Sequence, residues 1–92
     1  FGPLLSVACI ENLEEGIRLV NGLDYGLTSG LQSLDEKEQK LWKNSVMAGN
    51  LYINRGITGA IVNRQPFGGM KLSAFGGGIK AGGPNYCTCF LD

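Results

Sequence analysis

Apolar and polar positions follow two kinds of spacing in the first part of the chain. Residues 4–10 form a short apolar run without charge, which is typical of a strand buried on both faces. Residues with helical spacing follow it: Leu13, Gly16, Ile17 and Val20. Asn12 and Glu15 have the spacing of a capping box. We therefore predict a helix that begins after Asn12 and ends near Asn21-Gly22, with the glycine in the left-handed conformation.

The same order of elements repeats once. Residues 28–34 are short of charge and predict a second strand, and Asp35 with Glu38 forms a second capping box. The helix that follows is expected to end at Gly49, and residues 50–54 predict a third strand. Because strands and helices alternate with short connections, the fold class is α/β, with three short parallel strands and two crossover helices.

The second half of the chain has a different composition. Ten of the fifteen glycines lie from Gly49 onward, and the helical spacing is lost. We predict a long glycine-rich loop region over residues 55–84, which follows the β-α-β-α-β portion at residues 1–54. Residues 85–92 regain apolar, strand-like character, and we predict a C-terminal edge strand that is available for pairing with another chain.

Charge and cysteine content exclude several classes of partner and site. Eight Lys and Arg residues balance eight Asp and Glu residues, and this balance argues against a nucleic-acid or anionic membrane partner. No apolar run is long enough for a transmembrane helix. The number of cysteines is odd, with Cys9, Cys87 and Cys89, and this is unlike a secreted disulfide framework. It indicates a reducing, cytoplasmic location. Because the chain has no histidine to supply further ligands, we predict no metal site at these cysteines.

Candidate chemistry is concentrated in the loop region. The carboxylates occupy cap and helix positions, so we predict no catalytic residue in this chain. The small residues Thr58, Gly59 and Ala60 leave backbone N–H groups accessible, either as an anion-binding nest for a carboxylate or simply as a turn. Phe67 stands on a turn constrained by its proline and glycine neighbours, where it either fills the core or lines a pocket.

Several motifs together resemble a known family. Segments in this order and spacing resemble the C-terminal part of the aldehyde dehydrogenase superfamily: residues 1–4, 24–30, 48–54 and 66–73. Residues 57–69 and 80–86 are similar to those of the 1-pyrroline-5-carboxylate (L-glutamate γ-semialdehyde) dehydrogenases, above all the dehydrogenase part of bacterial bifunctional proline-utilisation proteins. This resemblance implies NAD-dependent oxidation of L-glutamate γ-semialdehyde to L-glutamate in proline catabolism, with a cysteine nucleophile and a glutamate base.

The resemblance also implies roles for individual residues. Phe1 corresponds to an aromatic residue near the nicotinamide of NAD, Gly59 and Ala60 to the segment that anchors the substrate's α-carboxylate, and Phe67 to a residue lining the aldehyde pocket. The family's nucleophile and base precede the segment that Phe1 begins. We therefore expect the chain to be a fragment of a longer enzyme and to be inactive alone.

The resemblance implies partners beyond the substrate. FAD is expected only if a proline dehydrogenase domain lies upstream. Family members assemble, so a homo-oligomer formed through the C-terminal strand is expected. The alternative is a structural or assembly module without ligand or catalysis.

Overall fold

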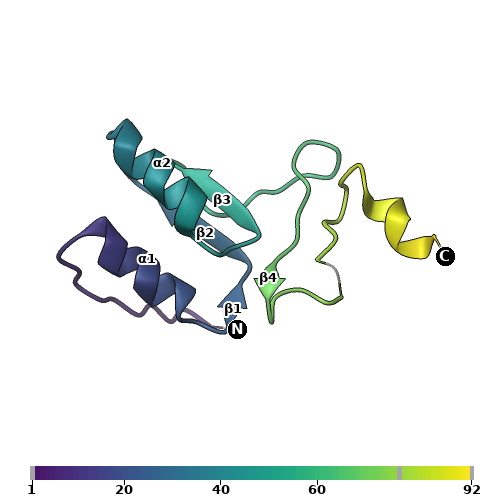
Figure 1. Cartoon of the computed structure of the whole chain (residues 1–92). Helices are drawn as coiled ribbons and strands as arrows, with labels where there is room; N and C mark the ends of the chain where they lie inside the picture. Colours follow the sequence, from purple (N-terminus) through teal and green to yellow (C-terminus); the bar gives the residue numbers. More distant parts are fainter. Residues whose placement is uncertain (1, 77, 92) are drawn as a thin grey trace.

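Two parallel strands joined by a helix form the centre of the computed structural model, which describes residues 2–76 and 78–91. Strand β2 (Thr28–Leu31) pairs in parallel with β3 (Asn50–Ile53), so that Thr28 lies opposite Asn50 and Leu31 opposite Ile53. Helix α2 (Glu36–Ser45) connects them and lies along one face of the pair, beside α1 (Leu13–Asn21) (Figure 1).

The hydrophobic core lies between the helices and this face of the sheet. Ile17, Trp42 and Val46 are its buried members. Partly buried hydrophobic side chains from α1 and both strands pack against them: Leu13, Leu31, Leu51 and Ile53. Because side chains alternate along a strand, Asn50 and Tyr52 of β3 are directed to the opposite face. Both are nevertheless buried, and that face carries the second half of the chain.

Both helices begin at the predicted capping residues. The Asn12 side chain accepts a hydrogen bond from the Glu15 backbone N–H at 2.9 Å. At α2 the Asp35 side chain accepts from the Lys37 N–H at 2.7 Å. The second bond of the predicted capping boxes differs at both helices: the Glu15 carboxylate accepts from the Glu11 N–H at 2.8 Å, and the Glu38 carboxylate accepts from the Ser33 hydroxyl. Local capping rules therefore locate both helix starts.

The predicted end of α1 at Asn21-Gly22 is confirmed, but the predicted conformation of Gly22 and the predicted end of α2 were wrong. Gly22 caps α1 with φ of −73°, a right-handed conformation, because its N–H still donates to the carbonyls of Arg18 and Leu19. Helix α2 ends at Ser45, with Val46 as an extended cap, and does not continue to Gly49. Gly49 instead lies where the backbone of Gly68 comes close, since a Cβ there would overlap the Gly68 carbonyl.

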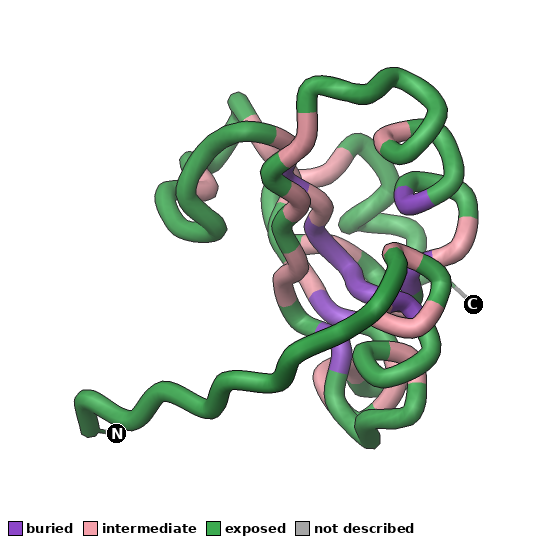
Figure 2. The backbone as a smooth tube through the Cα atoms, turned by 90° about the vertical axis from the view of Figure 1, so that its left-hand side faces the viewer, coloured by how far each residue is buried: buried purple, intermediate pink, exposed green. Residues whose placement is uncertain are grey.

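The strand predicted at residues 4–10 is absent, so the expected set of three parallel strands contains two. This segment extends away from the rest of the molecule (Figure 2), with Leu4 91% and Val7 80% exposed. A strand needs a neighbouring strand for its backbone hydrogen bonds, and the described residues provide none beside it.

A short antiparallel pair connects the two halves of the chain. Strand β1 (Tyr25–Gly26) pairs with β4 (Met70–Lys71), an element that the sequence did not predict within the loop region. The Ser73 hydroxyl accepts from the Gly26 N–H at 3.1 Å. The Lys71 ammonium group donates to the carbonyls of Asn21 and Leu23, each at 2.8 Å. These contacts bind the second half to the end of α1.

The C-terminal segment is a 3₁₀ helix, η1 (Tyr86–Phe90), so the predicted edge strand was wrong. Its hydrogen bonds are local, for example from the Thr88 N–H to the Asn85 carbonyl at 3.1 Å. The rings of Tyr86 and Phe90 contact each other edge to face, with centroids 5.8 Å apart. In the described ranges, no helix has the length and apolar character required to cross a membrane.

Candidate functional site

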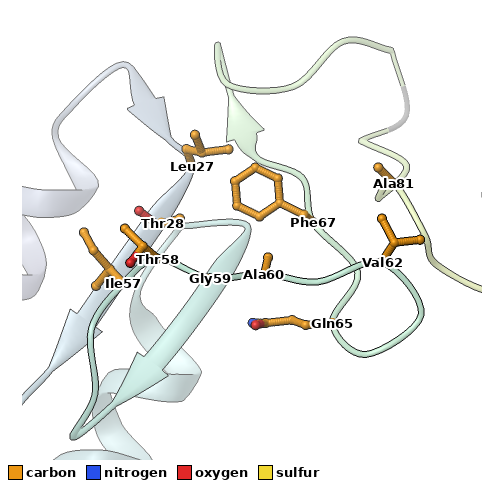
Figure 3. Close-up of a pocket in the computed structure, with 10 residues that line it drawn as sticks. All are labelled: Leu27, Thr28, Ile57, Thr58, Gly59, Ala60, Val62, Gln65, Phe67 and Ala81. Carbon is orange, nitrogen blue, oxygen red and sulfur yellow. The ribbon is translucent and has the colours of Figure 1, made fainter. Parts of the chain in front are cut away.

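A cavity of about 530 Å³ opens between the start of β2 and the loop that follows β3. Figure 3 shows its walls, which come from three segments distant in sequence. The lining residues are Leu27, Thr28, Ile57, Thr58, Gly59, Ala60, Val62, Gln65, Phe67 and Ala81. The sequence predictions for Gly59, Ala60 and Phe67 thus fall on one cavity. Phe1 lies outside the described residues.

The backbone around Gly59 has hydrogen-bond donors that are not used by any described residue. Gly59 has φ of +90°, in the region that favours glycine. Within the part of the chain that the structure describes, no hydrogen-bond acceptor contacts the N–H groups of Gly59 and Ala60. The preceding carbonyl, that of Thr58, accepts from the Arg55 guanidinium at 3.4 Å. Two adjacent free N–H groups are suited to binding an anionic oxygen.

The Phe67 ring forms part of the cavity wall and is 37% exposed. In Figure 3 the ring is drawn between Leu27 and Ala60. Its backbone is fixed by a two-way bridge to Ala81: the Phe67 N–H donates to the Ala81 carbonyl at 3.0 Å, and the Ala81 N–H donates back at 2.8 Å. Phe67 therefore lies in the cavity wall and is not among the buried core residues, and its role in an aldehyde pocket stays a prediction.

The remaining lining residues supply an uncharged surface. Leu27, Ile57 and Val62 are apolar, while the threonine hydroxyls and the Gln65 amide are the polar side-chain groups. None of the ten lining residues carries a charged side chain or a thiol. Such a cavity is able to hold a small molecule with an anionic end at the backbone and an apolar body along the wall, and its own residues supply no nucleophile or base.

Sequence reasoning missed several of these residues. Leu27 and Thr28 lie in the motif at residues 24–30, but nothing in that motif pointed to a cavity. Gln65 and Ala81 also had no signal of their own, because they reach the site only through the turn after Ile61 and the bridge to Phe67. The three cysteines are free and exposed, and none lines the cavity.

Comparison with known proteins shows one family over the whole chain. The sequence profile described as "Aldehyde dehydrogenase family" matches residues 1–92. Among curated relatives, the 1-pyrroline-5-carboxylate dehydrogenase of Oceanobacillus iheyensis is 40% identical and 1-pyrroline-5-carboxylate dehydrogenase 2 of Bacillus subtilis is 41% identical, each over 92 residues. The match covers all of this chain and 18% of each relative.

Solved structures agree with this result. Proline utilization A from Corynebacterium freiburgense is 63% identical with a TM-score of 0.79, covering 83% of this chain and 8% of that chain. A Thermus 1-pyrroline-5-carboxylate dehydrogenase, solved with bound NAD, is 41% identical with a TM-score of 0.88. That match covers 99% of this chain and 17% of the Thermus chain. The small α/β arrangement described above is therefore similar to part of these larger folds.

Proposed function

Because the chain belongs to the aldehyde dehydrogenase family, we propose that it is a segment of an NAD-dependent dehydrogenase that oxidises L-glutamate γ-semialdehyde to L-glutamate. The names of its relatives, 1-pyrroline-5-carboxylate dehydrogenases and proline utilization A from bacteria, support this reaction and a place in proline utilisation. A cytoplasmic location is part of the proposal. FAD enters the proposal only if the polypeptide also carries a proline dehydrogenase domain.

The observation that carries the proposal is the pair of N–H groups at Gly59 and Ala60 beside the Phe67 ring, for which the described residues supply no acceptor. L-Glutamate γ-semialdehyde has an α-carboxylate at one end and an aldehyde at the other. Its carboxylate oxygens would accept from the two N–H groups, and its methylene groups would lie along the apolar wall. Hydrogen bonds to a charged group contribute about 1.5–3 kcal/mol each, which is enough to select this substrate over an aldehyde without the carboxylate.

In this proposal the chain contributes binding and orientation. Gly59 and Ala60 hold the carboxylate, and Phe67 limits the position of the aldehyde end and excludes water from it. NAD accepts a hydride when it is bound, but Phe1, the one residue expected near it, lies outside the described residues. The cysteine nucleophile and the glutamate base are proposed to lie in a part of the enzyme that this chain does not contain.

Assembly is a further part of the proposal. We retain a division into residues 1–54, the substrate-anchoring loop at 55–84 and an assembly segment at 85–92. Tyr86–Phe90 within the last of these form a short 3₁₀ helix and not a strand, so self-association would occur through the apolar side chains of the segment. Exposed Phe90 and Leu91 support this role.

The test measures NAD-dependent oxidation by the full-length polypeptide that contains this chain. Gly59→Val inserts a side chain at the free N–H groups, and we expect the KM for L-glutamate γ-semialdehyde to rise by about tenfold or more. The KM for an aldehyde that lacks the α-carboxylate should change far less. The control is Gly56→Val, because Gly56 has no neighbour within 4 Å of an added Cβ.

Two outcomes contradict different parts of the proposal. If the unaltered polypeptide does not oxidise the semialdehyde, the reaction is wrong and the assembly module takes its place. If it is active but Gly59→Val raises both KM values equally, the reaction stands and the carboxylate site is wrong.

A further inference from the structure

Asn50 is a buried polar residue that reaches the site from the sheet. It is 4% exposed and is the first residue of β3. Its side-chain N–H donates to the Pro66 carbonyl at 2.8 Å, and its side-chain oxygen accepts from the Gly68 N–H at 3.1 Å. The two partners flank Phe67 in sequence. One amide therefore fixes the backbone on both sides of the residue whose ring forms the cavity wall.

The direction of these two bonds restricts the residue type. An amide has both a donor and an acceptor, and here each is used by a backbone group of the opposite kind. Aspartate keeps the acceptor but loses the donor, and its charge would then face the Pro66 carbonyl. Because Asn50 is buried, a polar group left without a hydrogen-bond partner there would destabilise the folded state.

The backbone of Asn50 is hydrogen-bonded to the opposite wall of the cavity. Its N–H donates to the Leu27 carbonyl at 3.0 Å, and both Leu27 and Thr28 line the cavity. The side-chain and backbone bonds of one residue thus determine the separation between the start of β2 and the Phe67 turn. Displacement of Asn50 would change the shape of the cavity without touching its lining groups.

We propose that Asn50 is a positioning residue that sets the place of the Phe67 ring against the aldehyde end of the substrate. This inference rests on the proposed function for its effect on catalysis. Its geometric part is independent of that function, since it concerns only the Phe67 turn. Asn50 does not line the cavity and acts through Phe67.

A matched control exists at the end of α1. The side chain of Asn21 makes the same pair of bonds to another segment, donating to the Ser45 carbonyl at 2.8 Å and accepting from the Met47 N–H at 2.7 Å. Neither partner lines the cavity. Asn21→Asp therefore makes the same chemical change as Asn50→Asp in a side chain that makes no hydrogen bond to residues 66–68.

The experiment is a double-mutant cycle in the full-length polypeptide, with Asn50→Asp, Phe67→Leu and the combination. We expect Asn50→Asp to lower kcat/KM for the semialdehyde about tenfold, and to have an effect of less than about twofold when Phe67 is already leucine. If the two substitutions lower kcat/KM independently, so that their factors multiply in the double variant, Asn50 does not act through Phe67. Asn50→Ala, which adds no charge, should behave in the same way, and Asn21→Asp should leave kcat/KM within about twofold.

A second measurement does not depend on activity. Hydrogen exchange of the Phe67 amide should become about tenfold faster in Asn50→Asp and stay unchanged in Asn21→Asp. Faster exchange in a polypeptide without semialdehyde oxidation would leave the positioning inference standing and the proposed function wrong. Unchanged exchange would overturn the inference whatever the activity.

Discussion

The two halves of the chain are stabilised in different ways. Residues 13–54 contain both long helices, the parallel strands and the hydrophobic core around Trp42. Among the described residues from 55 onward, Gly69 alone is buried, and the regular elements are a two-residue strand and a 3₁₀ helix. The first half is held by buried apolar volume, whereas the second half depends on hydrogen bonds and close backbone contacts with the first.

Several bonds show this dependence. The Leu72 N–H donates to the Asp24 carbonyl at 3.1 Å, and the Lys80 ammonium group donates to the Gly49 carbonyl. Together with the Asn50 and Lys71 bonds, they place the loop that carries Gly59 and Phe67 on a rigid support. The comparison shows how a segment with almost no core of its own is able to present a defined site.

The largest effect is expected in the core of the first half. Trp42→Ala removes a side chain that is 4% exposed and should lower the free energy of unfolding of this chain by about 3–5 kcal/mol. Urea denaturation followed by circular dichroism measures the change. Leu34→Ala, at an exposed position, is the control and should have almost no effect. A small loss for Trp42→Ala would mean that the core is not the basis of this half's stability.

The next effect is expected at the contact between the halves. Gly49→Ala places a Cβ against the Gly68 carbonyl. Because this overpacks the contact, the free energy of unfolding should fall by about 2–3 kcal/mol. The helical circular dichroism signal should persist while hydrogen exchange around Phe67 accelerates. Gly56→Ala meets nothing within 4 Å and is the matched control. Equal loss of structure in both halves would contradict the inference that the two halves are stabilised in different ways.

The smallest effect is expected at Tyr52, on the loop-facing side of β3. Its hydroxyl is buried and has no hydrogen-bond partner among the described residues. Tyr52→Phe removes this group and should raise the free energy of unfolding by about 1 kcal/mol. Tyr25→Phe, at an exposed position, should leave it unchanged. Destabilisation by Tyr52→Phe would show that the hydroxyl is paired in solution.

Sequence reasoning succeeded where the determinants are local. Asn12 and Asp35 cap helices through backbone groups two or three residues away, so the spacing alone located both helix starts. It failed at residues 4–10 and 85–91. Both segments are apolar enough for strands, but a strand also requires a partner, and the described residues supply none.

Part of the cavity lining could be predicted for the same reason. Gly59, Ala60 and Phe67 were singled out through small residues, a constrained turn and a family motif, and the structure places all three at one cavity. Their roles in substrate binding stay predictions. Asn50 had no such signal, because its partners lie sixteen and eighteen residues further along the chain. A hydrogen bond of this range depends on how the loop returns to the sheet, which the pattern of residues does not encode locally.

The extended segment at residues 4–10 has a consequence for the behaviour of the chain in concentrated solution. It presents seven successive uncharged, mostly apolar residues in an extended and solvent-exposed form. Segments of six or seven residues with this composition are those from which intermolecular cross-β stacks grow. Covering this segment by a neighbouring sheet would protect the polypeptide against aggregation as well as complete its fold.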